Sequence, residues 1–67
     1  MVYPLLRKKM KEQKVTIVKL AALLGLSRRG VQLKINGKNP FRLDESIRIQ
    51  EECFPDIELK ELFTRES

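Results

Sequence analysis

Apolar residues recur at helical spacing along most of the chain, in blocks that proline, glycine and asparagine separate. These blocks predict helices over residues 4–14, 16–25, 27–36 and 43–54, and a short fifth helix that carries Leu59, Leu62 and Phe63. No convincing run alternates apolar and polar residues as a half-buried strand would. The pattern therefore predicts an all-α fold of five helices, compact because every connection is short.

The helix ends have recognisable capping residues. Thr16 and Ser27 each precede an apolar-periodic block, and both are good N-cap residues. Gly25 can adopt the left-handed conformation that ends a helix. Asp56, after the helix-breaking Pro55, is expected to cap the fifth helix.

The predicted core follows from the same spacing. Its members are Leu6 and Met10 in the first helix, Leu20, Ala21 and Leu24 in the second, Val31 and Ile35 in the third, and Leu43, Ile47 and Phe54 on a common face of the fourth. Val15, before the second helix, can form a hydrophobic staple with Leu20. Two interpretations remain open for Ile17, Val18 and Leu23: they complete a buried helix, or they form a small exposed patch.

The composition excludes several classes of protein. Sixty-seven residues make one domain, 1–67, with no room for a second core. The chain has no histidine and one cysteine, Cys53, so an internal disulfide is impossible and a zinc site is not expected. It also lacks a phosphate-cradling glycine loop and paired acids in its basic part, so we expect no enzyme and no cofactor. Cys53 is read as a small apolar residue, with a thiol at a dimer interface as the alternative.

Charge divides the chain into two parts. Residues 1–42 carry a net charge of +10, whereas residues 43–67 carry −5. The first part is typical of a protein that binds a polyanion, and the alternative is a solvated basic surface. The run "RKKMK" at 7–11 fits a solvated helix face and a phosphate clamp equally well. No apolar run reaches the roughly 18 residues of a membrane span and no signal peptide opens the chain, so we expect a cytoplasmic protein without membrane contact.

The turn at residues 25–27 and the arginines behind it suggest a function. A helix that ends at Gly25 and another that begins after Ser27 match a helix-turn-helix over about 16–36. In the third helix, Arg28, Gln32 and Asn36 recur every four residues on the face expected to lie opposite the buried stripe. Arginine can donate two hydrogen bonds to guanine and glutamine can pair with adenine, while an apolar side chain can contact the thymine methyl group. Leu33 is the candidate for that methyl contact.

The stretch from Thr16 to Asn39 resembles the helix-turn-helix of the phage repressor and Cro family, and the matching residues are "T...LA..LGLSR.GV....NGKN". The continuation "KINGKNPFRLDESIRIQ" is similar to small prophage members of this family, which often read Lys-apolar-Asn-Gly-Lys and then Phe-x-Leu-x-Glu. The resemblance spans roughly residues 5 to 63 and implies a five-helix repressor-like domain. It also implies a regulator of transcription that binds a double-stranded DNA operator as a homodimer, whose formation can depend on the operator.

The resemblance also implies which residues contact DNA. The base-reading candidates are Arg28, Arg29, Gln32 and Leu33, and the candidates for phosphate or the groove edge are Thr16, Asn36, Lys38 and Asn39. The chain departs from the family pattern at Ile17, where a polar residue usually stands beside the phosphates. It departs again at Lys34, where the general pattern has an apolar residue.

A second function class stays open at this point. A small protein-interaction adaptor, antitoxin-like or anti-repressor, could use the acidic C-terminal helices with Cys53, Phe54 and Phe63 as its working surface. For a DNA-binding dimer, the best candidate for the partner surface is Cys53 to Ile57, at the junction of two predicted helices.

Overall fold

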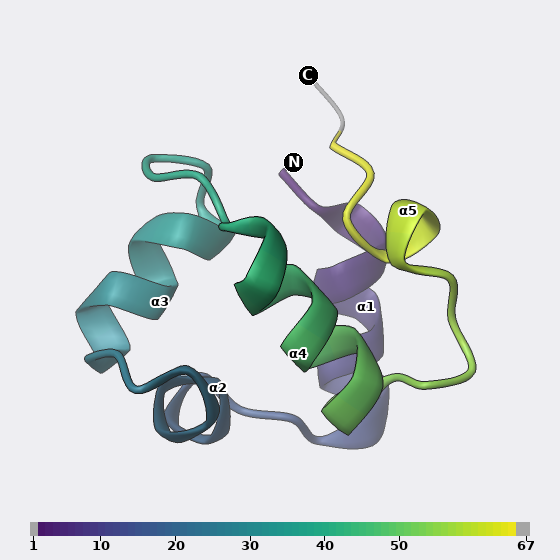
Figure 1. The fold of residues 1–67 in the computed structure, drawn as a ribbon, viewed down its shortest axis with the longest axis horizontal. Coiled ribbons are helices and arrows are strands. Elements are labelled where there is room, and N and C mark those ends of the chain that lie inside the picture. The colour runs from purple at the N-terminus through teal and green to yellow at the C-terminus, as the bar shows by residue number, and fades with distance from the viewer. Residues whose placement is uncertain (1, 66–67) are drawn as a thin grey trace.

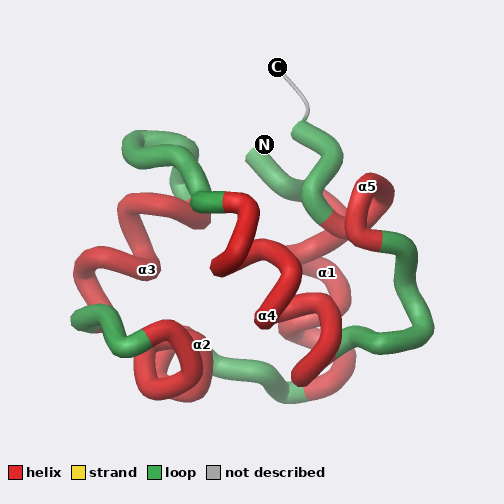
Figure 2. Tube along the Cα trace, viewed as in Figure 1, coloured by secondary structure: helices red, strands yellow, loops and turns green. Residues whose placement is uncertain are grey.

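The five predicted helices are present. The computed structural model describes residues 2–65 of the chain. The helices are α1 (Pro4–Gln13), α2 (Ile17–Leu24), α3 (Arg28–Ile35), α4 (Leu43–Cys53) and α5 (Leu59–Leu62). Residues 2–65 contain no strand, so the all-α class with five helices is confirmed (Figure 2).

The predicted caps of α2 and α3 are confirmed. The Thr16 hydroxyl accepts a hydrogen bond from the backbone N–H of Lys19 at 3.1 Å, and the Ser27 hydroxyl accepts one from Gly30 at 3.0 Å. Gly25 ends α2 with φ 69°, a conformation that glycine adopts without a Cβ penalty. The N–H of Leu26 then donates to the carbonyl of Ala21 at 2.9 Å, which satisfies a carbonyl at the helix end.

The helices pack around α4 (Figure 1). On one side α4 contacts α2, which in turn packs against α3. On the other side α4 contacts α5, which packs on α1. This arrangement places α3 at the outside of the bundle, away from α5, with one long side exposed (Figure 1).

The core contains most of the residues that the apolar spacing predicted. The fully or almost fully buried apolar residues are Tyr3, Leu6, Met10, Val15, Leu20, Ala21, Val31, Ile35, Ile49, Cys53, Phe54 and Leu62. Leu24 is only partly buried and packs against this core. The question left open for the second helix has a mixed answer: Ile17 and Leu23 are partly buried, whereas Val18 is 56% exposed.

The prediction of which face of α4 is buried is wrong. Leu43 is 71% exposed and Ile47 is 37% exposed. The buried face carries Ser46, Ile49 and Cys53 instead. Phe54 is buried as predicted, but it lies beyond the last helical residue with φ −136° and ψ 58°, so helical spacing does not set its direction.

The start of the fifth helix also differs from the prediction. Asp56 lies in a turn, and the N-cap of α5 is Glu58, whose side chain makes no capping hydrogen bond. The shift arises because the N–H of Ile57 donates to the carbonyl of Phe54 at 3.1 Å, so a turn occupies this segment before the helix begins. None of the helices in the described range is both long enough and apolar enough to cross a membrane.

Candidate nucleic-acid interface

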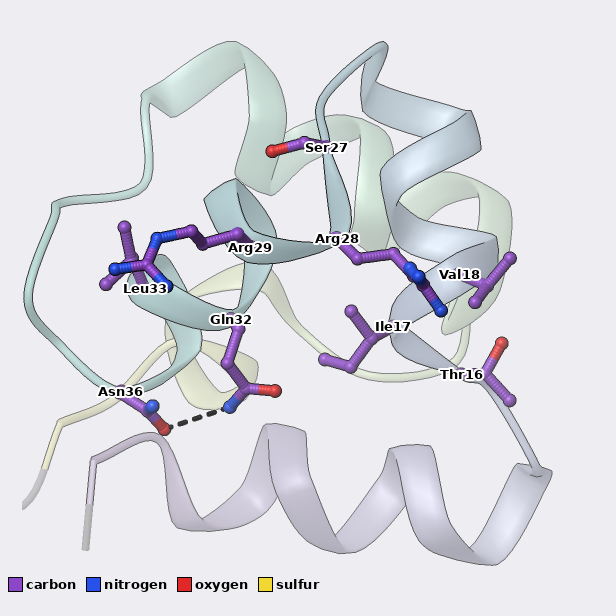
Figure 3. Close-up of a pocket in the computed structure, with 9 residues that line it drawn as sticks. All are labelled: Thr16, Ile17, Val18, Ser27, Arg28, Arg29, Gln32, Leu33 and Asn36. Carbon is purple, nitrogen blue, oxygen red and sulfur yellow. Dashed lines mark hydrogen bonds between the residues drawn. The ribbon is translucent and has the colours of Figure 1, made fainter.

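The N-terminal ends of α2 and α3 meet at one hollow in the protein surface. The hollow measures about 940 Å³ and is lined by Thr16, Ile17, Val18, Ser27, Arg28, Arg29, Gln32, Leu33 and Asn36 (Figure 3). Neither helix has an acidic residue in its first turn. Because the unpaired N–H groups of a helix N-terminus carry partial positive charge, both helix ends favour an anion in this region.

The hollow is rich in positive charge and hydrogen-bond donors. Arg28, Arg29 and Gln32 are all exposed, and the lining contains two guanidinium groups but no carboxylate. Among residues 2–65, the ion pairs join Lys9 with Glu12, Lys34 with Glu45 and Arg42 with Asp44. Arg28 and Arg29 therefore make no ion pair within the described residues, and their donors face solvent.

The directions of the α3 side chains correct one part of the sequence interpretation. Arg28, Gln32 and Asn36 do not lie opposite the buried stripe. Gln32 and the buried Ile35 line the same small hollow beside α1, and Arg28 extends toward α2 (Figure 3). With about 100° per residue, Gln32 and Ile35 are separated by only about 60° around the helix. Arg29 and Leu33 are the residues that project on the side away from α2 (Figure 3).

Asn36 is held by side chains from two helices. Its Oδ1 accepts a hydrogen bond from Gln32 Nε2 at 3.2 Å and another from Arg7 Nη2 at 2.8 Å. Its side-chain amide group remains as a donor toward the hollow, which Asn36 also lines. Asn36 is therefore fixed before any ligand binds.

Arg7 is a residue whose role the sequence did not reveal. Besides its bond to Asn36, its guanidinium donates to the carbonyls of Val2 at 2.8 Å and Ile35 at 3.3 Å. Arg7 thus links α1 to the C-terminal end of α3, where the helix dipole favours a cation. Within the run "RKKMK", Arg7 is partly buried and bonded to other segments of the chain, whereas Lys8 and Lys11 are exposed.

Lys38 and Asn39 lie outside the hollow, in the loop that follows α3. Their backbone N–H groups donate to the carbonyl of Leu33 at 2.9 and 3.3 Å, and both residues are exposed. Gly37 makes this turn with φ 79°. The structure therefore brings together six of the eight candidate residues in one hollow. The remaining two, Lys38 and Asn39, lie in the loop that follows α3.

Lys34, which departs from the apolar pattern, forms an ion pair inside the fold. Its Nζ lies 2.6 Å from Glu45 Oε1, and the two side chains are only 13% and 11% exposed. Glu45 also accepts from the backbone N–H of Arg42 at 2.9 Å. Burial alone raises the pKa of Glu45, but the hydrogen bonds from Lys34 and Arg42 outweigh it and lower the pKa below its usual value.

In the segment Cys53 to Ile57, predicted as the partner surface, Cys53 and Phe54 are too buried to contact a partner. Cys53 is 9% exposed and Phe54 is 1% exposed, so neither offers a surface. Burial raises the pKa of the Cys53 thiol. Phe63 packs edge-on against Tyr3 and Phe41, with ring centroids 5.9 and 5.2 Å away. The exposed apolar residues of the C-terminal part are instead Leu43 and Ile47 on α4.

No group of three or more acidic or cysteine side chains in the described range could hold a metal ion. No family model, curated protein or solved structure matches this chain. The case for a function therefore depends on the geometry of the hollow and on the pattern of the sequence.

Proposed function

We propose that this protein binds double-stranded DNA in a sequence-specific manner and regulates transcription, as a phage- or prophage-type regulator without catalytic activity. In this proposal α2, the turn at 25–27 and α3 act as a helix-turn-helix, and α3 enters the major groove of an operator. One observation carries the proposal: Arg28, Arg29 and Gln32 stand exposed on the first turns of α3, around a hollow that has no carboxylate.

The chemistry of these side chains suits base edges and phosphates. Arg28 would donate two hydrogen bonds to guanine O6 and N7, and Gln32 would pair with adenine N6 and N7. The N-terminal ends of α2 and α3, together with Thr16, would hold phosphates, and Lys38 in the loop after α3 would hold a further phosphate, which fixes the register on the duplex.

A homodimer would complete the site. One recognition helix covers few base pairs, so two copies about one helical turn apart, roughly 34 Å, would give a useful operator. Because the basic hollow is committed to DNA in this proposal, the exposed Leu43 and Ile47 on α4 replace Cys53 and Phe54 as the candidate partner surface. We propose that this contact is weak in free solution and completes on the operator.

A protein-interaction adaptor is the second candidate. The exposure of Leu43 and Ile47 beside Asp44, Glu51 and Glu52 favours it, since a surface of this kind can bind a basic partner protein. The burial of Cys53 and Phe54 removes the surface first considered for it. Nothing in this alternative explains why Arg28 and Arg29, beside two helix N-termini, make no ion pair with any residue of the range 2–65.

Selection of binding sites from random duplex DNA tests the proposal. The expected result is one enriched sequence with two symmetric half-sites about one helical turn apart. Titration of the selected duplex and of a scrambled duplex at several salt concentrations should give higher affinity for the selected one and a steep loss of both with salt. Equal affinity for all duplexes, or no binding at low salt, would remove the proposal and favour the adaptor.

A further inference from the structure

Ile17 is an apolar residue at the centre of the donor-rich hollow. Its side chain lies between Arg28 and Gln32, on the floor that α2 contributes (Figure 3). Ile17 and Gln32 line both the main hollow and the smaller neighbouring one beside α1. Ile17 is partly buried and packs against the core, so its position is fixed while part of its surface remains open to the hollow.

An apolar residue at this position needs an explanation. It is the first residue of α2, where a polar side chain could reach a phosphate. Isoleucine offers no hydrogen bond, and Val18, the next residue of α2, extends the apolar surface on the other side of the guanidinium of Arg28 (Figure 3). The hollow therefore combines hydrogen-bond donors at its rim with an apolar floor between them.

The major groove of DNA offers one natural counterpart to such a floor. The C5 methyl group of thymine is the apolar group that base edges present there. If Arg28 binds a guanine and Gln32 binds an adenine, the thymine paired with that adenine presents its methyl group next to both contacts. Ile17 lies between the two donors that would define this step.

We propose that Ile17 is a specificity-determining residue that contacts the C5 methyl group of a thymine adjacent to the guanine bound by Arg28. This inference rests on the proposed DNA-binding function. It names one further element of the recognised sequence, a thymine in each half-site that the protein distinguishes from uracil by its methyl group alone.

The experiment replaces each thymine of the selected duplex by uracil, one at a time, which removes only the methyl group. At one position in each half-site the affinity of the unchanged protein should fall about fourfold, as expected when one methyl group loses its buried contact. Ile17→Ala should bind the thymine and uracil duplexes equally at that position. The ratio of the two affinities is taken within one variant, so any loss of folded protein cancels.

Two further variants serve as controls. Leu23→Ala truncates an apolar side chain on another side of the same helix, where Leu23 lines a hollow with Ile47, and should keep the full thymine preference. Ile17→Val removes a single methylene with little effect on folding and should reduce the preference only in part.

The outcomes separate the two proposals. Suppose that the protein prefers one sequence but that uracil lowers its affinity at no position, or lowers it equally for Ile17→Ala. Such a result would overturn the role of Ile17 and leave DNA binding intact. A protein without any preferred sequence would overturn both.

Discussion

Lys34 of α3 and Glu45 of α4 form an ion pair in which Nζ and Oε1 lie 2.6 Å apart. Lys34 also donates to the carbonyl of Pro40 at 3.3 Å, in the loop between the two helices. The pair therefore fastens the C-terminal half of α3 to the start of α4, although α3 packs mainly against α2. A lysine at an apolar position is thus satisfied by a partner eleven residues later in the chain.

The pair should make the protein sensitive to acid. The pKa of Glu45 is lowered, so its stabilising contribution is fully present above the ordinary carboxylate pKa and is lost as the pH falls through the lowered value. We expect Glu45→Gln to reduce the free energy of unfolding near neutral pH by about 1.5–3 kcal/mol, because Lys34 loses its charged partner. Urea unfolding near pH 7 and near pH 3 measures both effects, and the variant should show a weaker pH dependence.

Asp44→Asn is the matched control. Asp44 also pairs with a cation, Arg42, but both side chains are more than 70% exposed. An exposed pair contributes little because solvent screens it, so this variant should leave the pH dependence almost unchanged. Equal effects of Glu45→Gln and Asp44→Asn would show that the burial of the Lys34 pair has no energetic consequence.

Arg7 gives a second stability prediction. Arg7→Lys keeps the charge but cannot make the separate bonds to Val2, Ile35 and Asn36 that the guanidinium makes. We expect a loss of about 1–2 kcal/mol in the free energy of unfolding. The neighbouring Lys8 is exposed, so Lys8→Gln should have almost no effect in the same urea titration. If Arg7→Lys leaves the free energy of unfolding unchanged, the three contacts do not stabilise the junction of α1 and α3.

Two glycines with positive φ should respond differently to alanine. At Gly25, φ is 69° and a Cβ would meet nothing within 4 Å, so Gly25→Ala should cost only the strain of the left-handed backbone, about 1–2 kcal/mol. At Gly37, φ is 79° and a Cβ would lie 3.0 Å from a methyl carbon of Val2. Gly37→Ala should therefore cost more than Gly25→Ala. Thermal unfolding of the two variants checks the order, and the reverse order would contradict it.

Both ends of α2 and the start of α3 were predictable from sequence because capping is local. Thr16, Gly25 and Ser27 act on backbone groups within about one turn, so their residue types are sufficient. The buried face of α4 was not predictable in the same way. This helix carries one apolar pair at Leu43 and Ile47 and another at Ile49 and Cys53, both at a spacing of four residues. Only the packing of α4 against the other helices selects which pair is buried.

In the candidate site too, local features were predictable from sequence and features that depend on packing were not. Local sequence placed Arg28, Arg29 and Gln32 on α3 and predicted that they are exposed. The link from Arg7 to Asn36 joins residues 29 positions apart, and no spacing pattern predicts it. The direction of Gln32 was misjudged because repetition every four residues shows that side chains share a face but does not show which face another helix covers.

Cys53 should react slowly while the protein is folded. It is buried, and its pKa is raised, so little thiolate is present near neutral pH. We expect a disulfide reagent to modify Cys53 only at the rate of local or global opening, and to modify it rapidly in urea. Rapid modification of the folded protein, or a disulfide-linked dimer under mild oxidation, would contradict the buried position and restore the interface role for this thiol.

The last prediction separates side chains that read bases from those that hold phosphates. Within the proposed function, Arg28 reads a guanine from inside the hollow, so Arg28→Ala should weaken binding to the selected duplex by about 1–3 kcal/mol and barely affect a scrambled duplex. Lys38 lies in the loop after α3, and Lys38→Ala should weaken both duplexes alike and reduce the salt slope by about one unit. Arg29 projects away from Arg28, and we expect it to behave like Lys38 (Figure 3).

Titrations of Arg28→Ala, Arg29→Ala and Lys38→Ala against both duplexes at two salt concentrations distinguish these roles. The comparison is internal, because Arg28 and Arg29 are adjacent, are both exposed and carry the same charge. Any difference between their variants must therefore come from the direction of the side chain, which turns by about 100° from one helical residue to the next. If Arg28→Ala weakens both duplexes equally while Arg29→Ala affects only the selected one, the outer face of α3 reads the bases and the hollow beside α2 holds the phosphates.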